Sequence, residues 1–267
     1  MRTELDAEAL LRLWECGLGQ PPGARGEALL RALSEDIEPA LTLGECNTRL
    51  VALHADLFGR ELELISHCPA CGTVVQFNAD CEALAAQMWQ RSENTEPHRL
   101  EAQGHIIEFR LPNSADIASA SATVTATTTR IATLADDEDT FTDTFTDAFT
   151  DAFTQALLDR CVLSCTLDGA TVPTHEVPAP ALDALSQHME TLDPGASVSF
   201  ALACPQCAIR WQAPLAIGEL VWQKVRAAAE RVLLDIDVLA RAYGWTEREV
   251  LRLNPLRRAA YLQMVTS

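Results

Sequence analysis

Two short stretches decide the fold: ELELISHCPACGTVVQF at residues 61–77 and SVSFALACPQCAIRWQAPL at residues 197–215. In each, a β-rich run leads into a Cys-Pro-x-Cys turn, and a second β-rich run leads out of it. This pattern predicts a β-hairpin folded around a metal-binding turn. The two turns together supply four thiolates, the donor set of a tetrahedral structural zinc site. We therefore predict a zinc ribbon, split by a long insertion, with the ligands Cys68, Cys71, Cys204 and Cys207.

Two alternatives bear on this metal site. A degenerate ribbon could keep its cysteines without metal, and Ala208 favours that alternative because glycine usually follows the second cysteine of such a turn. His67 could replace one cysteine as a ligand, although a solvated histidine is the simpler interpretation. The other five cysteines are predicted to be small buried residues rather than a second site: Cys16, Cys46, Cys81, Cys161 and Cys165. Four thiolates leave no open coordination position, so the zinc would be structural and not catalytic.

The remaining chain is predicted to complete an α+β fold, with helical N- and C-terminal parts around the split ribbon. Apolar residues at helical spacing fill the N-terminal part, and the C-terminal part reads as three helices. Gly244 is expected to end the first of these, a capping box from Thr246 to Glu249 opens the second, and Asn254 with Pro255 opens the third. The predicted regions are 1–60 (helical), 61–80 (first half of the ribbon), 81–195 (α+β insertion), 196–215 (second half of the ribbon) and 216–267 (three helices).

The insertion contains a low-complexity segment near residues 119–142. Twelve threonines lie between Thr123 and Thr154, together with an acidic run and the repeat TFTDTFTDAFTDAFT. Because threonine is a poor helix former, we expect a mobile loop here, with helix resuming only from about Asp147. Ser114 is predicted to cap a short helix just before this segment. The rest of the insertion is expected to hold a hairpin turning near Gln103-Gly104, a strand pair near CTLDGATV and a helix around PALDALSQHME.

Composition and motif content argue against several classes of function. The formal net charge is −18, which opposes binding to nucleic acid or to an anionic membrane surface. The sequence shows no apolar run long enough to span a membrane and no signal peptide, and its nine cysteines favour reduced thiols. We therefore expect a cytoplasmic protein. Motifs for phosphate binding, dinucleotide binding, serine hydrolysis or metalloprotease chemistry are missing from the sequence, so we expect no enzyme.

The segment LTLGECNTRLVALHADLFGRELELISHCPACG resembles the assembly chaperones of phage baseplate hubs and related proteins encoded beside contractile injection systems. In that family a Gly-x-x-(Asp/Asn)-x-x-Leu-Leu helix ends in Phe-Gly and is followed by a Cys-Pro-x-Cys turn. Gly44, Asn47, Leu50, Phe58 and Gly59 occupy the helical positions here, and Val51 replaces the second leucine. Further similar stretches are WECGLGQPPGAR, FRLPNSADIA, LLDRCVLSC and the tail VLARAYGWTEREVLRLNPLRRAAYLQMV.

The resemblance implies a cytosolic, non-enzymatic helper whose partner is a baseplate hub or spike protein. A contact surface is expected on the C-terminal helices, with aromatic anchors and a polar rim: Trp222, Trp245, Arg257, Arg258 and Tyr261. The alternative for these aromatics is a place in the core. Two other functions stay open, a zinc-ribbon regulator that binds nucleic acid and a structural baseplate subunit.

Overall fold

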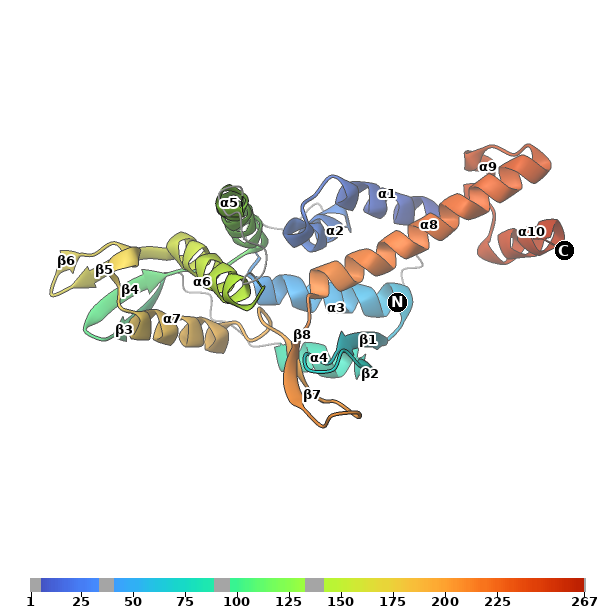
Figure 1. Ribbon diagram of the computed structural model, residues 1–267. Coiled ribbons are helices and arrows are strands. Elements are labelled where there is room, and N and C mark those ends of the chain that lie inside the picture. The colour runs from blue at the N-terminus through green and yellow to red at the C-terminus, as the bar shows by residue number, and fades with distance from the viewer. Residues whose placement is uncertain (1–5, 34–40, 89–96, 133–141, 267) are drawn as a thin grey trace.

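The computed structural model describes residues 6–33, 41–88, 97–132 and 142–266. It confirms the predicted mixture of helix and sheet, with a helical body, two cysteine-bearing hairpins and an inserted α+β unit (Figure 1). The body lies in the middle of the molecule. The inserted unit lies at one end, and the last helices project from the other end (Figure 1).

The central body consists of helices packed against the first half of one long helix. Its elements are α1 (Ala7–Leu18), the 3-10 turn η1 (Pro22–Ala24), α2 (Arg25–Leu33), α3 (Leu43–Phe58) and α8 (Ile217–Tyr243). Each α-helix carries one apolar face; α3, for example, buries Leu50, Val51 and Leu53. A capping box between Thr42 and Glu45 opens α3.

Trp222 of α8 is the largest fully buried side chain of the body, with 2% of its surface exposed. It packs against Gly17 of α1 so closely that a Cβ at Gly17 would lie 2.2 Å from the indole ring. The Arg25 guanidinium lies 5.4 Å from the ring centroid, where the cation is attracted by the π face. Trp222 therefore joins α1, α2 and α8. For this residue a place in the core, the alternative to a place on a contact surface, is the correct one.

Two antiparallel hairpins carry the cysteine turns. The first is formed by β1 (Glu61–His67) and β2 (Val74–Asp80), and α4 (Cys81–Met88) follows it; the second is formed by β7 (Ser199–Ala203) and β8 (Arg210–Pro214). In β1 the alternation of charged and apolar residues buries Leu62 and Leu64 and exposes Glu61 and Glu63. These leucines anchor the first hairpin to the body core.

The inserted unit is a four-stranded antiparallel sheet with helices packed on it. Its strand order is β3-β4-β5-β6, formed by β3 (His98–Ala102), β4 (His105–Phe109), β5 (Val162–Leu167) and β6 (Ala170–Thr171), with η2 (Thr174–Glu176) and α7 (Ala179–Leu192) after them. The predicted turns are present at Gln103-Gly104 and Asp168-Gly169, and both residues of each turn have positive φ. The sheet and α7 share a separate core centred on Phe109 and Leu185.

Helix replaces the predicted loop over the described part of the threonine-rich segment. Helix α5 runs Ser114–Ala132, and α6 runs Thr142–Cys161, so helix also resumes earlier than Asp147; residues 133–141 lie outside the described residues. Tertiary packing overrides the low propensity, because Ala120 and Val124 of α5 are buried. The Thr123 and Thr125 hydroxyls donate to carbonyls one turn earlier, which satisfies them within the helix.

The start of α5 also differs from the prediction, because Asn113 rather than Ser114 provides the cap. The Asn113 side-chain oxygen accepts a hydrogen bond from the Asp116 N–H at 3.0 Å, and the Asp116 carboxylate accepts one from the Asn113 N–H at 3.0 Å. Arg110 binds the same carboxylate with two bonds of 2.6 and 2.7 Å. Burial alone would raise the pKa of Asp116, but Arg110 outweighs it and the pKa is lowered.

The C-terminal end of the insertion is hydrogen-bonded to the start of α3. The Asp193 carboxylate accepts a hydrogen bond from the Gly44 N–H at 2.9 Å, and the Asn47 amide donates to the Gly195 carbonyl at 2.9 Å. Asp193 is buried, and this desolvation raises the pKa of its carboxyl group. A carboxylate is held there because the N-terminus of α3 is the positive end of the helix dipole, and because the Gly44 N–H in its first turn has no partner within the helix. Gly44 and Asn47, noted in the sequence for a family pattern, thus form a joint between body and insertion.

The C-terminal helices follow the predicted stops and starts. Gly244 adopts φ 69° and ends α8, a capping box between Thr246 and Glu249 opens α9 (Glu247–Leu251), and α10 spans Pro255–Thr266. The second half of α8, α9 and α10 project from the body, and we call residues 233–266 the arm (Figure 1). Among the described helices, none combines the length and hydropathy that crossing a membrane requires.

Substituting Gly44→Ala should destabilise the protein by about 1–3 kcal/mol, as other overpacked buried positions do. A Cβ at Gly44 would lie 1.7 Å from the Asp193 carboxylate oxygen, so the joint must open. Thermal unfolding followed by circular dichroism measures the effect. Gly19→Ala is the matched control, because a Cβ there meets no atom within 4 Å and the melting temperature should hardly change. Equal melting temperatures for the two variants would show that the joint adds no stability.

Candidate metal centre

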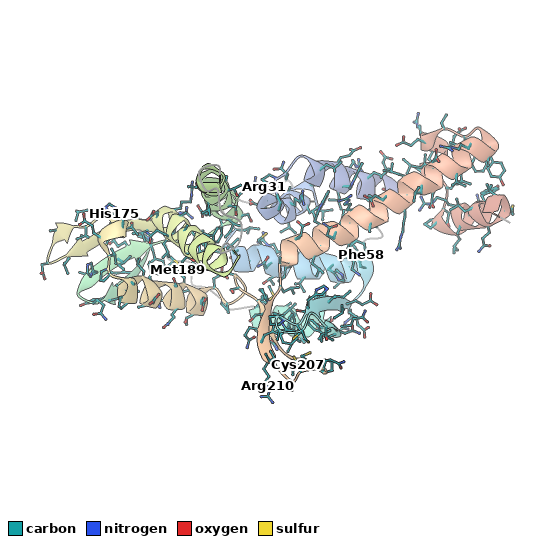
Figure 2. All side chains as sticks on the ribbon, viewed as in Figure 1. Arg31, Phe58, His175, Met189, Cys207 and Arg210 are labelled. Carbon is teal, nitrogen blue, oxygen red and sulfur yellow. The ribbon has the colours of Figure 1, made fainter. Side chains whose placement is uncertain are left out.

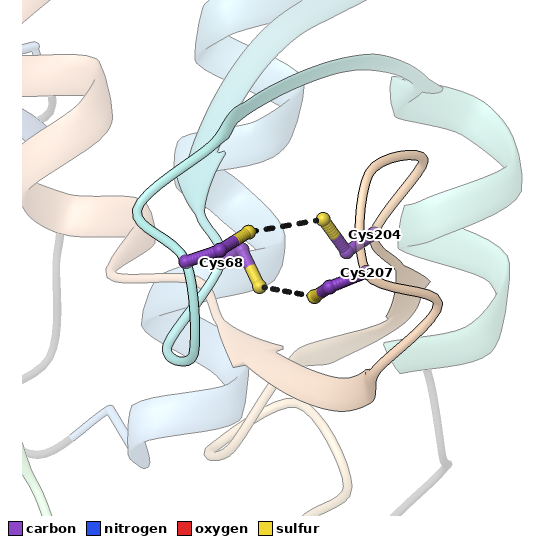
Figure 3. Close-up of side chains that lie close together, drawn as sticks. Cys68, Cys204 and Cys207 are labelled. Atoms are coloured by element: carbon purple, nitrogen blue, oxygen red, sulfur yellow. Dashed lines mark hydrogen bonds between the residues drawn. The ribbon is translucent and has the colours of Figure 1, made fainter.

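The four predicted cysteines meet at the tips of the two hairpins (Figure 3). All four sulfur atoms lie within 4.8 Å of one another. The Cys68 and Cys207 sulfurs are 3.6 Å apart, and the Cys71 and Cys204 sulfurs are 3.5 Å apart. Sequence positions more than one hundred residues apart are therefore brought into one cluster, as the paired turns predicted.

The two turns are near copies of each other in backbone hydrogen bonding. In the first, the Cys68 N–H donates to the Thr73 carbonyl at 2.9 Å, and the Gly72 N–H donates to the Cys68 carbonyl at 2.9 Å. In the second, the Cys204 N–H donates to the Ile209 carbonyl at 2.8 Å, and the Ala208 N–H donates to the Cys204 carbonyl at 3.0 Å. Each turn therefore aims its two thiols toward the same point without help from the other half.

The residue after the second cysteine is left-handed in both turns. Gly72 has φ 70° and Ala208 has φ 58°, so alanine occupies a conformation that suits glycine. The sequence showed only that the usual glycine was missing. The structure shows that the turn keeps the same shape despite that substitution, at a local cost in strain.

Apolar contacts hold the two hairpins together behind the sulfurs. The Phe77 and Phe200 rings meet edge to face with centroids 5.2 Å apart. A cleft of 240 Å³ lies beside them, and Trp211 and Pro69 form part of its lining. This ring pair could not be predicted from the sequence, because each phenylalanine simply occupies one more β-rich position of its own hairpin.

Neighbouring groups shift the pKa values of the thiols in this cluster in opposite directions. Hydrogen bonds from the hydroxyl and backbone of Thr73 lower the pKa of the Cys71 thiol to about 6. The backbone hydrogen bond at Ile209 lowers the pKa of Cys207, but desolvation and the neighbouring thiols outweigh it and raise the pKa to about 12. Four thiolates so close repel one another, and a bound divalent metal removes that repulsion.

The donor set and spacing fit a tetrahedral zinc ion. Zinc–sulfur bonds of about 2.3 Å place tetrahedral sulfurs about 3.8 Å apart, close to the shortest separations here. His67 is exposed and lies outside the cluster, so cysteine occupies all four positions. Bound zinc would link the hairpins and contribute to folding rather than to chemistry, because no open position remains for a substrate.

The other cysteines divide into two groups. Cys46, Cys81, Cys161 and Cys165 are buried as predicted. Cys16 is exposed, so its predicted burial is wrong: it lies on the outer face of α1, opposite the apolar stripe. Burial raises the pKa of the Cys46 thiol to about 11, which keeps that thiol protonated and unreactive.

One comparison with known proteins identifies the family. A model of the family described as T4 bacteriophage base plate protein matches residues 8–212. The chain belongs to this family. The match includes the body up to α4, the inserted unit and both cysteine turns, and it ends before α8. No curated protein and no solved structure matches the chain.

The structure separates the five expected partner-contact residues. Trp222 is buried in the body and cannot serve as a surface anchor in this state. Trp245 and Tyr261 lie in the arm, half-buried, with ring centroids 4.9 Å apart. Arg257 is exposed, whereas the Arg258 guanidinium is 3.3 Å from the Asp235 carboxylate with 13% of its side chain exposed.

Metal analysis of the purified protein should find about one zinc ion per chain, as expected for a four-thiolate structural site. Cys204→Ser removes one ligand from the cluster, and we expect it to lose the metal and unfold the ribbon. Cys16→Ser is the matched control, because this exposed thiol lies outside the cluster, and its zinc content should equal that of the natural sequence. Zinc well below one equivalent in the natural sequence as well as in Cys204→Ser would reject the site.

The residue after the second cysteine of each turn has a left-handed backbone conformation, and from this we predict opposite changes in stability for two substitutions. Ala208→Gly should stabilise the protein by about 0.5–1 kcal/mol, because glycine removes the left-handed strain, and Gly72→Ala should destabilise it by about the same amount. Denaturant unfolding at a fixed zinc concentration measures both changes. If Ala208→Gly lowers stability, the strain assigned to this turn is not there.

Proposed function

We propose that this base plate family protein is a non-enzymatic assembly chaperone or adaptor for the hub or spike of a phage tail or contractile injection system. It binds that component while both are free in the cytoplasm, before the component joins the baseplate. The observation that carries the proposal is the arm: a projecting set of helices with exposed apolar side chains, in a chain whose family is baseplate-associated. The other features support a scaffold and not a reaction.

The arm exposes several large apolar side chains. Leu234, Tyr243, Leu256 and Met264 are 64%, 40%, 81% and 68% exposed. Single exposed apolar residues are common, but a group of them on one projecting element is typical of a protein interface. We infer that these side chains contact the client.

An aromatic cluster makes the arm a rigid platform. The Tyr243 and Trp245 rings stack with centroids 4.7 Å apart, and the Tyr261 ring meets both edge to face. Together with the ion pair between Arg258 and Asp235, this cluster fixes α10 against the end of α8. A preformed surface binds with a smaller loss of conformational entropy than a flexible tail. Trp245 and Tyr261 therefore position the contact surface, and Arg257 extends it with an exposed charge.

The charge distribution suits a soluble helper. The chain carries −18 overall, whereas α10 carries two arginines and no acidic residue. An acidic body keeps complexes apart by repulsion and so keeps an aggregation-prone client in solution. In the parts of the chain that the structure describes, the four cysteines form the one metal-capable cluster, and a four-thiolate zinc has no position for a substrate.

The two rival functions make different demands. A structural subunit would use the same arm but would stay in the finished particle. A regulator that binds nucleic acid would need a basic surface, and in the arm Arg258 is already paired with Asp235 and Arg241 with Asp237. The net charge of −18 also opposes that function.

The test is co-expression with the baseplate hub and spike proteins of the same source, followed by pull-down. A truncation after Gly244 is the variant of choice, because it removes α9 and α10 but leaves Trp222 in the core. We expect the truncated chain to keep its zinc and its folded body and to lose the client. Leu163→Glu, which adds a charge at an exposed apolar position of the inserted unit, is the control and should keep the client.

Deletion of the gene completes the test. If the hub and spike proteins are equally soluble and equally assembled without this chain, the chaperone proposal is wrong. Recovery of the chain in purified mature particles would favour a structural subunit. Tight binding to duplex DNA at physiological salt would favour the regulator.

A further inference from the structure

A groove of about 710 Å³ lies between the body and the root of the arm. Its apolar lining comes from α1, α3, α8 and the loop after α9, and includes Leu10, Leu57, Phe58, Val232 and Leu253. Figure 2 labels Phe58, the last residue of α3. A groove of this size and lining is of the kind that accepts the apolar face of a helix.

The rim of this groove is acidic. Asp6 and Asp56 both line it, and Asp56 is exposed at the last turn of α3. Among the described residues no ion pair neutralises Asp56. The one basic residue in the lining, Arg258, is already paired with Asp235. The occupant should therefore be apolar on one face and basic beside it.

Helix α10 carries a surface of this type. Leu256, Ala260 and Met264 stand at i, i+4 and i+8, so they form one stripe along the helix, and all three are exposed. Arg257 lies next to the stripe, exposed, and no ion pair with a described residue neutralises it. The apolar stripe and its arginine match the groove and its aspartate in both hydrophobicity and charge.

The stripe cannot enter the groove of its own chain. Pro255 and Arg258 at the start of the same helix already form one wall of the groove, and the Arg258–Asp235 pair holds the helix there. In that position Leu256 remains 81% exposed and Met264 68% exposed. The groove and the stripe adjoin each other on one chain, so a twofold contact between two chains can bury both pairs of surfaces at once.

We propose that the occupant of the groove is α10 of a second copy of this chain, and that the client-free protein is a twofold dimer. The Leu256–Ala260–Met264 stripe of each chain packs on the Leu57 and Phe58 side of the other groove. Arg257 of one chain pairs with Asp56 of the other. The proposal does not rest on the chaperone function, although a client that uses the arm would then compete with the second copy.

Sedimentation velocity of the full-length protein at several concentrations tests the dimer. We expect dissociation to a monomer only on dilution, and about a tenfold weaker association for Asp56→Arg or for Arg257→Asp alone. Met264→Glu should weaken it further, because a charge would enter the apolar groove. Asp183→Arg changes net charge as Asp56→Arg does, on the exposed face of α7, and should leave the association unchanged.

Mixing the two charge-reversed chains is the decisive step. Asp56→Arg mixed with Arg257→Asp gives opposite charges at both contacts of the pair, one reversed and one as in the natural sequence, whereas either variant alone has like charges at both. The mixture should therefore associate more tightly than either variant alone. A monomeric natural protein at every concentration would overturn the proposal. Failure of the mixture to recover would overturn it as well. A monomer that still binds its client through the arm would leave the chaperone function standing and remove only the dimer.

Discussion

The closure of two distant hairpins over one four-sulfur cluster is the constraint on which the rest of the structure depends. Cys68 and Cys71 end one hairpin and Cys204 and Cys207 end the other, so everything between them is a closed loop. The entropy of closing such a loop grows only slowly with its length, and an insertion of this size is therefore tolerated. The inserted sheet can form its own core around Phe109 without disturbing the body.

The closure also determines where the chain re-enters the body. After the second hairpin, α8 starts at Ile217 and carries Trp222 into the space between α1 and α2. On the other side of the hairpin, Asp193 and Gly195 dock on Gly44 and Asn47 of α3. The second cysteine turn is thus held from both sides, by a buried aromatic after it and by a buried carboxylate before it. The arm is the continuation of α8 beyond this fixed region.

Features whose cause lies within a few residues could be predicted from the sequence. Four such features are present in the structure as expected: the cysteine turns, the hairpin turn at Gln103-Gly104, the end of α8 at Gly244 and the capping box at Thr246. Features decided by distant partners could not be predicted. Helix α5 forms because Ala120 and Val124 find a packing surface, and Trp222 is buried because Gly17 leaves room for its ring. Neither partner can be identified from the spacing of residues along the chain.

Hydrogen exchange before and after zinc removal by a chelator tests the central claim most directly, because a structural metal contributes its binding energy to the fold it closes. The account predicts that the amides of β1, β2, β7 and β8 lose protection together, whereas those of α1 and the first half of α8, which share the Trp222 core, keep most of theirs. Unchanged protection of both hairpins after complete removal of the metal would contradict it. In that case the sulfur cluster would not be what holds the two halves together.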